Sequence, residues 1–406
     1  MSVSRALSWI TLLAYLNGGG TDSGGGGNTG NDDVVEVVLE SETPDQDMLS
    51  GITQLVALNC PNALSIGDNA FCYIPCLSSI DLPKAKTIGY QAFYTCPNLL
   101  SVNLPMVETI NDYAAFGLCT SLVSVDLPKV TKMGSSTFHD CVSLMSVNLP
   151  MIDMIEYGVF SFCSSLASVN LPMATSIGES AFDCCYSLTN ISLPMVTSIG
   201  EAAFNCCVSL TSADIPKLEA IPDYAFCQSP CLSDINMPMV TSIGKCAFGD
   251  CSSLMSIDLP NVNNIGESAF SCCTSLTSVN LPMAGIIFSY AFDYCPRLET
   301  VTLPMAFSIQ DYAFSGCENL YALILNNIYE FCEGLTPTVL YGTKMYDPDG
   351  VYLGEGHIYV PSSMYETYAD QYDNADSFPD FRDLFRILED YTVDGTITGE
   401  LDPTKI

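Results

Sequence analysis

The stretch SLTNISLPMVTSIGEAAFNCC at residues 187–207 recurs along most of the chain, and its spacing decides the fold. Twelve prolines mark the copies, and ten of the eleven intervals between them are 22 residues long. A fixed period in the low twenties is the signature of a solenoid, because each unit is too small to bury its own apolar face and must stack on its neighbours. The marker prolines are Pro61, Pro83, Pro105, Pro128, Pro150, Pro172, Pro194, Pro216, Pro238, Pro260, Pro282 and Pro304.

The first half of each copy predicts a short strand. In LTNISL the apolar residues alternate with polar ones, so Leu188, Ile191 and Leu193 are expected to point inward. Pro194 lacks a backbone donor and should end this strand. A second short extended piece is expected in VTSI, which follows directly.

The second half of each copy predicts a turn that carries an aromatic core residue. We interpret EAAFNCC (201–207) as one turn of α- or 3₁₀-helix that places Phe204 and Cys207 in the core. Glycines such as Gly200 are expected to serve the tight turn before it. Stacked strands lie about 5 Å apart, so the phenylalanines of successive copies should form a continuous row.

The repeat C-x-x-L-x-x-[VI]-x-L-P-x-V-x-x-I-G-x-x-A-F-x-x-C resembles the BspA-type leucine-rich repeat of bacterial and protozoan surface proteins over about residues 52–325. The resemblance implies a leucine-rich-repeat right-handed solenoid, with a parallel β ladder on its concave face and short β and helical turns on its convex side. It also implies a surface-exposed binding protein that is not an enzyme.

The N-terminal part of the chain precedes the repeats. Residues 1–16 contain the apolar run ALSWITLLAYL, which is too short to span a bilayer and fits either a signal-peptide core or a docking helix. Residues 17–33 form a Gly-rich linker. We assign 34–51 to an N-terminal cap with a candidate edge strand, and 52–326 to the solenoid.

The C-terminal part changes in composition and predicts a small α+β capping module over residues 327–391. A strand is expected before Pro361 and a serine-capped helix after it. The stretch 381–391 could form a second short helix or a return strand. Residues 392–406 are expected to form a tail.

Composition and charge narrow the class of partner. The net charge is −34, with only 12 lysines and arginines. Nucleic acids and anionic membrane surfaces both require a basic face, so neither is an expected partner. The acidic excess is expected to keep a long β array soluble and monomeric.

Ten of the twenty cysteines occupy one position of the repeat. We interpret those three residues after the phenylalanine as a ladder of buried thiols that act as small apolar groups. Their side chains should point the same way in successive copies, which disfavours disulfides between them. The ladder members are Cys96, Cys119, Cys141, Cys163, Cys185, Cys207, Cys251, Cys273, Cys295 and Cys317.

The remaining cysteines raise two other possibilities. Cys184 and Cys206 each precede a ladder member in neighbouring copies, and they are the best candidates for a disulfide. The motifs CYIPC (72–76) and CQSPC (227–231) lie seven turns apart, so they cannot share a zinc ion. A local disulfide or a shifted ladder thiol is expected in each motif. We therefore predict no metal site.

The sequence contains little that could support catalysis. The two histidines are His139, directly after a core phenylalanine, and His357, in the C-terminal module. No Ser–His–Asp or Cys–His arrangement can be assembled on the repeat geometry, and no phosphate-binding or metalloprotease motif occurs. We expect no catalytic residues and no cofactor.

The variable positions of the repeat provide the candidate binding residues. Two polar files should lie on the outward face of the strand, and a methionine-rich file directly follows the prolines. A structural explanation is that amides bond along the ladder and methionines pack at a bend. The functional alternative is an adaptable contact surface, since methionine repacks readily. The candidates are Asn148, Met151, Asn170, Met173, Ser192, Met195, Asn236 and Met239.

These observations favour a non-catalytic extracellular or cell-surface adhesion protein that binds an extracellular protein or glycan of a host or neighbouring cell. One alternative is a phage tail component that is docked by its N-terminal segment in a virion. Another is an architectural spacer without a ligand.

Overall fold

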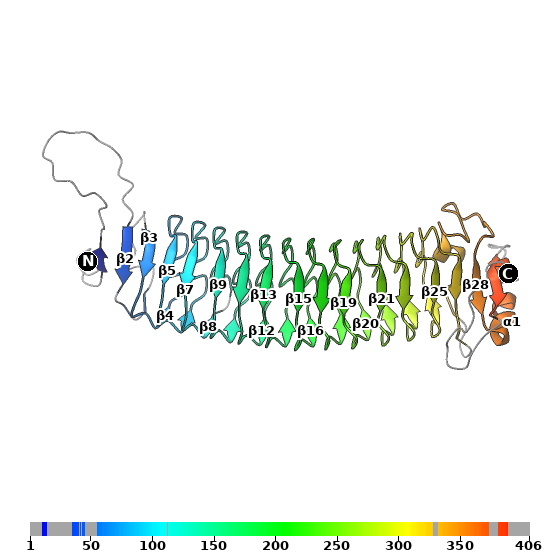
Figure 1. Cartoon of the computed structure of the whole chain (residues 1–406), viewed down its shortest axis with the longest axis horizontal. Helices are drawn as coiled ribbons and strands as arrows, with labels where there is room; N and C mark the ends of the chain where they lie inside the picture. Colours follow the sequence, from blue (N-terminus) through cyan, green and yellow to red (C-terminus); the bar gives the residue numbers. More distant parts are fainter. Residues whose placement is uncertain are drawn as a thin grey trace, which may run out of the picture. The chain divides into compact units, whose positions relative to one another are not determined.

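The computed structural model describes residues 10–13, 35–39, 41, 43–44, 55–111, 113–327, 332–372 and 381–388. The chain divides into two compact units, Met1–Thr189 and Asn190–Ile406. In both, the repeats form a parallel-strand β-solenoid with little helix, as the period predicts (Figure 1). Each turn contributes one strand to a long ladder, in which most strands have three residues, and one two-residue strand to a short ladder.

The first unit begins with strands β1 and β2. Its long ladder consists of β3 (Leu55–Asn59), β5 (Ser79–Asp81), β7 (Ser101–Asn103), β9 (Ser124–Asp126), β11 (Ser146–Asn148) and β13 (Ser168–Asn170). Its short ladder consists of β4 (Ser65–Ile66), β6 (Thr87–Ile88), β8 (Thr109–Ile110), β10 (Lys132–Met133), β12 (Met154–Ile155) and β14 (Ser176–Ile177).

The second unit continues the same pattern and ends in the C-terminal module. Its long ladder contains β15 (Asn190–Ser192), β17 (Ser212–Asp214), β19 (Asp234–Asn236), β21 (Ser256–Asp258), β23 (Ser278–Asn280), β25 (Thr300–Thr302), β27 (Ala322–Ile324), β28 (His357–Val360) and β29 (Phe385–Ile387). Its short ladder contains β16 (Ser198–Ile199), β18 (Ala220–Ile221), β20 (Ser242–Ile243), β22 (Asn264–Ile265), β24 (Ile286–Ile287) and β26 (Ser308–Ile309).

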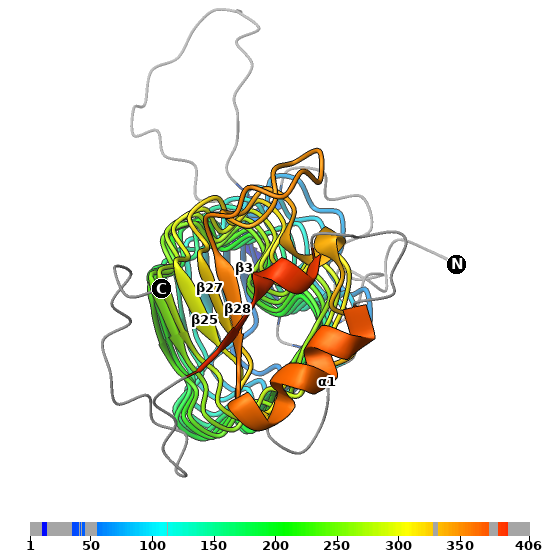
Figure 2. The same ribbon diagram turned by 90° about the vertical axis from the view of Figure 1, so that its right-hand side faces the viewer.

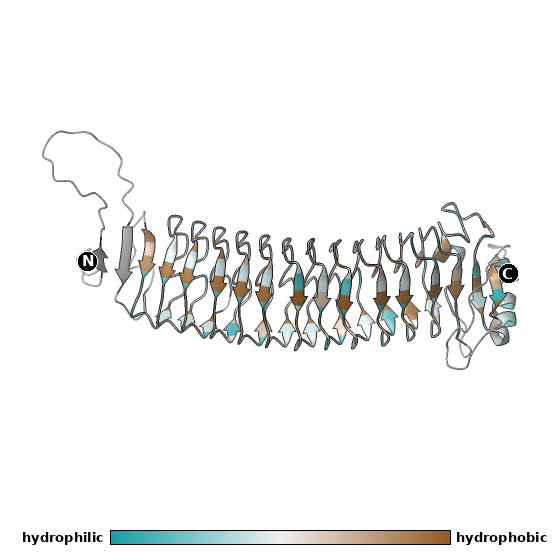
Figure 3. Ribbon diagram, viewed as in Figure 1, coloured by the Kyte–Doolittle hydropathy of each residue, from teal (hydrophilic) through white to brown (hydrophobic). Residues whose placement is uncertain are grey.

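Neighbouring long strands pair in parallel and in register. β11 pairs with β13 so that Ser146, Val147 and Asn148 lie beside the equivalent residues of the next turn. The middle residue points inward and its two neighbours point outward, which gives the alternation of apolar and polar residues along the strands in Figure 3. Equivalent side chains of successive turns therefore form continuous rows within each unit.

The phenylalanine row that the sequence predicts is confirmed in both units. In the first unit the ring centroids of successive residues from Phe71 to Phe182 lie 5.2–5.8 Å apart. In the second unit, the rings from Phe204 to Phe314 lie 5.2–5.5 Å apart. All of these side chains are buried, so stacked rings form the centre of the core.

The segment around each phenylalanine is a series of turns, where a helical turn was predicted. The N–H groups of Phe71 and Tyr73 donate to the carbonyls of Ala92 and Tyr94 in the next turn, both at 2.8 Å. Between them, Cys72 bonds within its own turn. Every second amide thus connects neighbouring turns, which a helix cannot do because its amides bond within the helix.

This alternation requires an uncommon backbone conformation. The residues two before and two after each phenylalanine have positive φ, as in Ser180 (52°) and Cys184 (58°) around Phe182. Only Gly158 and Gly316 place a glycine at such a position. Non-glycine residues disfavour this region, so the bonds between turns must hold the segment in place.

The repeated glycines have a different role from the one predicted. A Cβ atom on Gly178 would lie 2.6 Å from the carbonyl carbon of Glu156, and one on Gly266 would lie 2.4 Å from that of Gly244. Neither glycine has a left-handed φ. Glycine is needed there because the backbones of adjacent turns approach closely, and the tight-turn explanation is wrong.

The N-terminal strands cover the first turn. β1 (Ile10–Leu13) pairs antiparallel with β2 (Val35–Leu39), and β2 pairs in parallel with β3. Residues 10–13 are therefore extended and do not form part of a docking helix, which was one of the two alternatives for residues 1–16. The other residues of that segment lie outside the described part of the chain. The predicted Gly-rich linker (17–33), residues 45–51 of the predicted cap and residues 52–54 of the predicted solenoid lie outside the described residues.

The C-terminal module continues the long ladder with two further parallel strands. β28 pairs with β27, and β29 pairs with β28. The helix α1 (Ser362–Tyr372) follows Pro361, and Figure 2 shows it at this end of the second unit beside the last turns. Two 3₁₀ helices, η3 (Pro337–Leu340) and η4 (Phe381–Leu384), complete the module. Residues 389–406, which include the predicted tail, lie outside the description.

The module also covers the outward face of the last repeat strand. Ala322 and Ile324 of β27 take the place of the usual outward polar residues and are buried with Tyr359 and Leu388. Tyr368 of α1 packs on the ring of Phe385 at 5.3 Å, and its hydroxyl accepts a hydrogen bond from the Cys332 amide. No helix in the described part of the chain is both long and apolar enough to cross a membrane.

Candidate functional site

The predicted polar files lie on the outward face of the long ladder. In the first unit Asn170 is exposed and Asn148 is half-buried, at the ends of β13 and β11. In the second unit Ser192 and Asn236 are exposed at the ends of β15 and β19. Parallel in-register pairing turns each of these repeat positions into a row along its unit.

The amides of this file bond along the ladder. The Asn170 side chain donates to Asn148 Oδ1 at 2.7 Å, and Asn148 in turn donates to Asp126 at 2.8 Å. In the second unit Asn236 donates to Asp214 at 2.7 Å. These bonds support the structural explanation of the file, since each amide uses one of its donors within the protein. The remaining polar groups of these side chains still face solvent.

The methionine file lies at the turn that follows each long strand. Met151 and Met173 of the first unit have 54% and 55% of their surface exposed, and Met239 of the second has 56%. Met195 is less exposed, and its sulfur accepts a contact from Lys217 Nζ at 3.2 Å. Such exposure means that these methionines are not packed into a bend, because the buried position of the turn belongs to the next residue, Ile152 or Ala174.

A second apolar row lies at the other end of the strands, and sequence reasoning missed it. In the first unit Leu100, Val123 and Met145 are exposed, each directly before the outward serine that begins a long strand. Together with the methionines that follow the strands, they border the polar rows on both sides. A signal was present, since one repeat position carries large apolar residues just outside the predicted strand.

We call the resulting surface of each unit its strand-face patch. In the first unit it comprises the polar residues Asn148 and Asn170 with the exposed Met145, Met151 and Met173. In the second unit it comprises Ser192, Asn236, Met195 and Met239. Exposed apolar side chains beside polar rows are suited to protein or glycan contact, and the patch contains no group arranged for catalysis.

The cysteine ladder is confirmed as a set of buried thiols. All ten members are fully buried, and the structure has no disulfide among the cysteines that it describes. Their sulfurs also donate to the phenylalanine carbonyls of the preceding turn, as from Cys163 to Phe138 at 3.1 Å and from Cys251 to Phe226 at 3.3 Å. Burial raises the pKa of Cys96 to about 12, and it raises the pKa of Cys119 well above the usual range. Such thiols stay protonated and unreactive at neutral pH.

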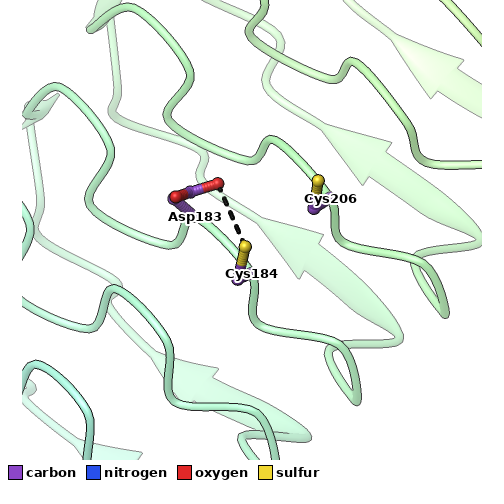
Figure 4. A group of neighbouring side chains, drawn as sticks. All are labelled: Asp183, Cys184 and Cys206. Atoms are coloured by element: carbon purple, nitrogen blue, oxygen red, sulfur yellow. Dashed lines mark hydrogen bonds between the residues drawn. The ribbon is translucent and has the colours of Figure 1, made fainter.

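Cys184 and Cys206, the best candidates for a disulfide, are not joined by one. Both are thiols at the same repeat position, two residues after a phenylalanine. Cys184 donates to the Asp183 carboxylate at 3.5 Å within the first unit (Figure 4). Cys206 donates to the side-chain oxygen of Gln228 at 2.9 Å within the second unit. Equivalent positions direct side chains alike, which opposes the bridge geometry.

Neither C-x₃-C motif forms a local disulfide. Cys76 and Cys231 are exposed thiols, and Cys72 is buried next to the core phenylalanine. The ladder position of the second motif is taken by Ser229, which is buried and donates to the Phe204 carbonyl at 3.4 Å. The shifted-thiol explanation is therefore wrong for this motif, because a serine hydroxyl makes the bond that a thiol makes elsewhere.

The histidines are each placed in a structural setting. His139 Nδ1 lies 2.9 Å from the carboxylate of Asp140, its neighbour in the chain. Burial and the nearby Arg386 lower the pKa of His357.

Comparisons with known proteins agree with the fold. A model of the BspA type leucine rich repeat region matches residues 45–164, 131–251 and 219–334. No curated protein matches the chain.

Solved structures with the same architecture are distant in sequence. A leucine rich cell surface protein from Faecalibacterium prausnitzii A2-165 is 22% identical over 93% of both chains, with a TM-score of 0.46. A leucine-rich repeat protein from Bacteroides ovatus ATCC 8483 is 22% identical over 78% of this chain and 93% of its own, with a TM-score of 0.37. The pneumococcal vaccine antigen PcpA is 16% identical over 82% and 80%, with a TM-score of 0.39.

Proposed function

Because the chain belongs to the family of BspA type leucine rich repeat proteins, we propose that it is a non-catalytic adhesion protein of the cell surface or extracellular medium. In this proposal the strand-face patches bind a protein or glycan on a host or neighbouring cell. The family supports a binding role in general, and the choice of surface comes from the geometry of the long ladder.

One observation carries the choice of surface. Met151 and Met173 are more than half exposed, whereas the residues that follow them, Ile152 and Ala174, are fully buried. Exposed methionines are adaptable contact groups, since their flexible, polarizable side chains fit varied partners. Rows with the repeat spacing of about 5 Å would let an extended partner touch several turns at once.

Most side chains of the patches are uncharged, which favours apolar contacts and neutral hydrogen bonds over ion pairs. The methionines, asparagines and serine of both patches are neutral, although Asp126 and Asp214 lie in the same polar rows. Binding there would arise from many weak contacts with a few dominant ones near the centre. We therefore expect a small effect when salt is raised from about 50 to 200 mM, because few charged contacts are screened.

The proposal is tested with a variant that alters both patches. Met151, Met173, Met195 and Met239 are changed together to serine in the full chain, which is then applied to arrays of extracellular-matrix proteins and of glycans. For a protein or glycan that the wild-type chain binds, the Kd of the variant should be at least tenfold higher. The melting temperature of the variant should be unchanged.

A matched control comes from the short ladder. Met154 of β12 is also exposed but lies outside the patches, so Met154→Ser should bind as the wild type does. If the quadruple variant keeps full affinity, the strand-face patches are structural and the proposal for them is wrong.

A further inference from the structure

A cavity of about 680 Å³ lies in the second unit, between the last repeats and the loop that precedes β28. Tyr294 and Tyr312 of the repeats and Tyr341 of the loop contribute to its lining. Its size lies within the range of sites that enclose a small molecule. None of these residues belongs to a strand-face patch.

The cavity exists because the repeat pattern changes at this point. Tyr294 occupies the position two residues after a core phenylalanine, and 61% of its surface is exposed. In the next turn the same position is Gly316, where a Cβ atom would lie 3.2 Å from the Tyr294 ring. Gly342 follows, with its own missing Cβ 3.2 Å from the Gly316 nitrogen. Because Gly316 has no side chain, the Tyr294 ring can lie close to the backbone there, and most of its remaining surface is exposed.

The aromatic walls are held in fixed positions. Tyr312 stacks on Tyr290 with ring centroids 5.0 Å apart and planes within 8°. Tyr341 stands nearly perpendicular to Tyr312 at 6.2 Å, and its carbonyl accepts a hydrogen bond from Gly316 at 2.8 Å. The rings are therefore arranged before any ligand arrives, which reduces the entropy lost on binding.

Polar groups of both kinds line the same space. Lys344 Nζ lies 3.3 Å from a carboxylate oxygen of Glu355, and Glu318 extends the acidic side. Asp347 also contributes, with one carboxylate oxygen fixed by the amides of Asp349 and Val351. An ammonium donor, carboxylate acceptors and tyrosine hydroxyls can bond the hydroxyl groups of a ligand.

We propose that this cavity binds a neutral saccharide of one or two rings. The apolar face of a sugar ring would stack on the open side of Tyr294, and its hydroxyls would bond Lys344 and the carboxylates. A cationic ligand would also suit tyrosines and acids, and a tetra-arginine peptide serves as the probe for that class of ligand. The volume also exceeds what one basic side chain fills.

The test uses the full chain and defined probes. Lactose, cellobiose, maltose and chitobiose are each examined by saturation-transfer NMR, and titration of the strongest binder gives its Kd. Tyr294→Ala should weaken this binding by about tenfold or more, because the stacking platform is lost. Gly316→Asn should do the same by displacing the Tyr294 ring, because the new Cβ atom would lie 3.2 Å from it, and Asn tolerates the positive φ of this position.

A matched control is available at the other end of the repeats. Tyr73 occupies the same repeat position as Tyr294 and is exposed to 63%, but it does not line the cavity. Tyr73→Ala should bind the saccharide as the wild type does.

The proposal is overturned if no disaccharide of the panel binds, or if Tyr294→Ala binds as tightly as the wild type. It is also overturned if only a tetra-arginine peptide binds and this binding is lost in Tyr294→Ala, since the cavity would then belong to basic peptides. Loss of saccharide binding in Tyr294→Ala alone, with the methionine variant unaffected, separates this site from the strand-face patches.

Discussion

Two parts of a single repeat respond differently to the same stacking. In the turn around Phe160, the buried ring stacks on the equivalent rings of neighbouring turns, the Cys163 thiol donates to the Phe138 carbonyl, and the Phe160 amide donates to the Ala181 carbonyl. On the outward face of β13, Ser168 and Asn170 are exposed, and neighbours contribute one hydrogen bond to the amide. Where burial is complete the repeat tolerates little variation, and where solvent is present its residues vary.

The sharpest way to break the buried part is alkaline pH. Burial raises the pKa of the ladder thiols above their usual value of 9.0, to about 12 for Cys96. The folded chain thus retains protons that the unfolded chain releases, and stability falls as pH rises above about 9. Seven ladder thiols have a raised pKa: Cys96, Cys119, Cys141, Cys163, Cys251, Cys273 and Cys295. Each of them contributes about 1.4 kcal/mol per pH unit, so the chain should unfold between about pH 9 and 11.

The pH experiment has a direct readout and a control. Urea midpoints are measured from pH 8 to 11, together with thiol alkylation before and after unfolding without reductant. At least ten additional thiols should react once the chain is unfolded. Replacing Cys119, Cys141 and Cys163 by serine should make the loss of stability above pH 9 less steep, because three thiols with raised pKa are removed. All tyrosines are kept in this variant, so a change in slope comes from the thiols. An equal slope in this variant would contradict the assignment.

The next largest effect is expected from the aromatic row. Phe160→Ala should lower the free energy of unfolding by about 3–5 kcal/mol, because the ring is fully buried between Phe138 and Phe182. Phe162 lies in the same turn but is 46% exposed, and Phe162→Ala should cost less than about 1 kcal/mol. Similar losses in the two variants, measured by urea unfolding, would mean that burial does not distinguish the two positions.

The smallest effect is expected on the strand face. Asn170→Ala removes the 2.7 Å bond to Asn148 but leaves an exposed site that water can occupy. The free energy of unfolding should fall by less than about 1 kcal/mol. Ser168→Ala in the same strand provides the control and should be neutral. A loss as large as that of Phe160→Ala would show that the amide row, and not the aromatic row, holds the turns together.

Much of the fold could be predicted from the repeat. The 22-residue period, the alternation in strands such as Asn190–Ser192 and the invariant phenylalanine correctly predicted a parallel solenoid with a stacked aromatic core. The exposed methionines Met151 and Met173 were found for the same reason, since a residue outside every buried position of the repeat must face solvent.

The errors arose where local sequence and inter-turn contacts disagree. EAAFNCC suggests a helix because alanine and glutamate favour one, yet the Phe204 amide donates to the Ala225 carbonyl of the next turn at 2.9 Å. Gly266 suggests a turn, yet it is needed because a neighbouring backbone passes within contact distance.

The sequence by itself determined the period, the family, the buried residues and the choice of outward rows, because these follow from which positions stay apolar in every copy. Only the tertiary structure decided that the turns around the phenylalanines take left-handed φ values, that ladder thiols bond phenylalanine carbonyls, and that Tyr294 borders an open cavity. The physical reason is that these features depend on contacts between residues about 22 or more positions apart. A single copy of the repeat contains the residues for them but not the neighbour that fixes their conformation.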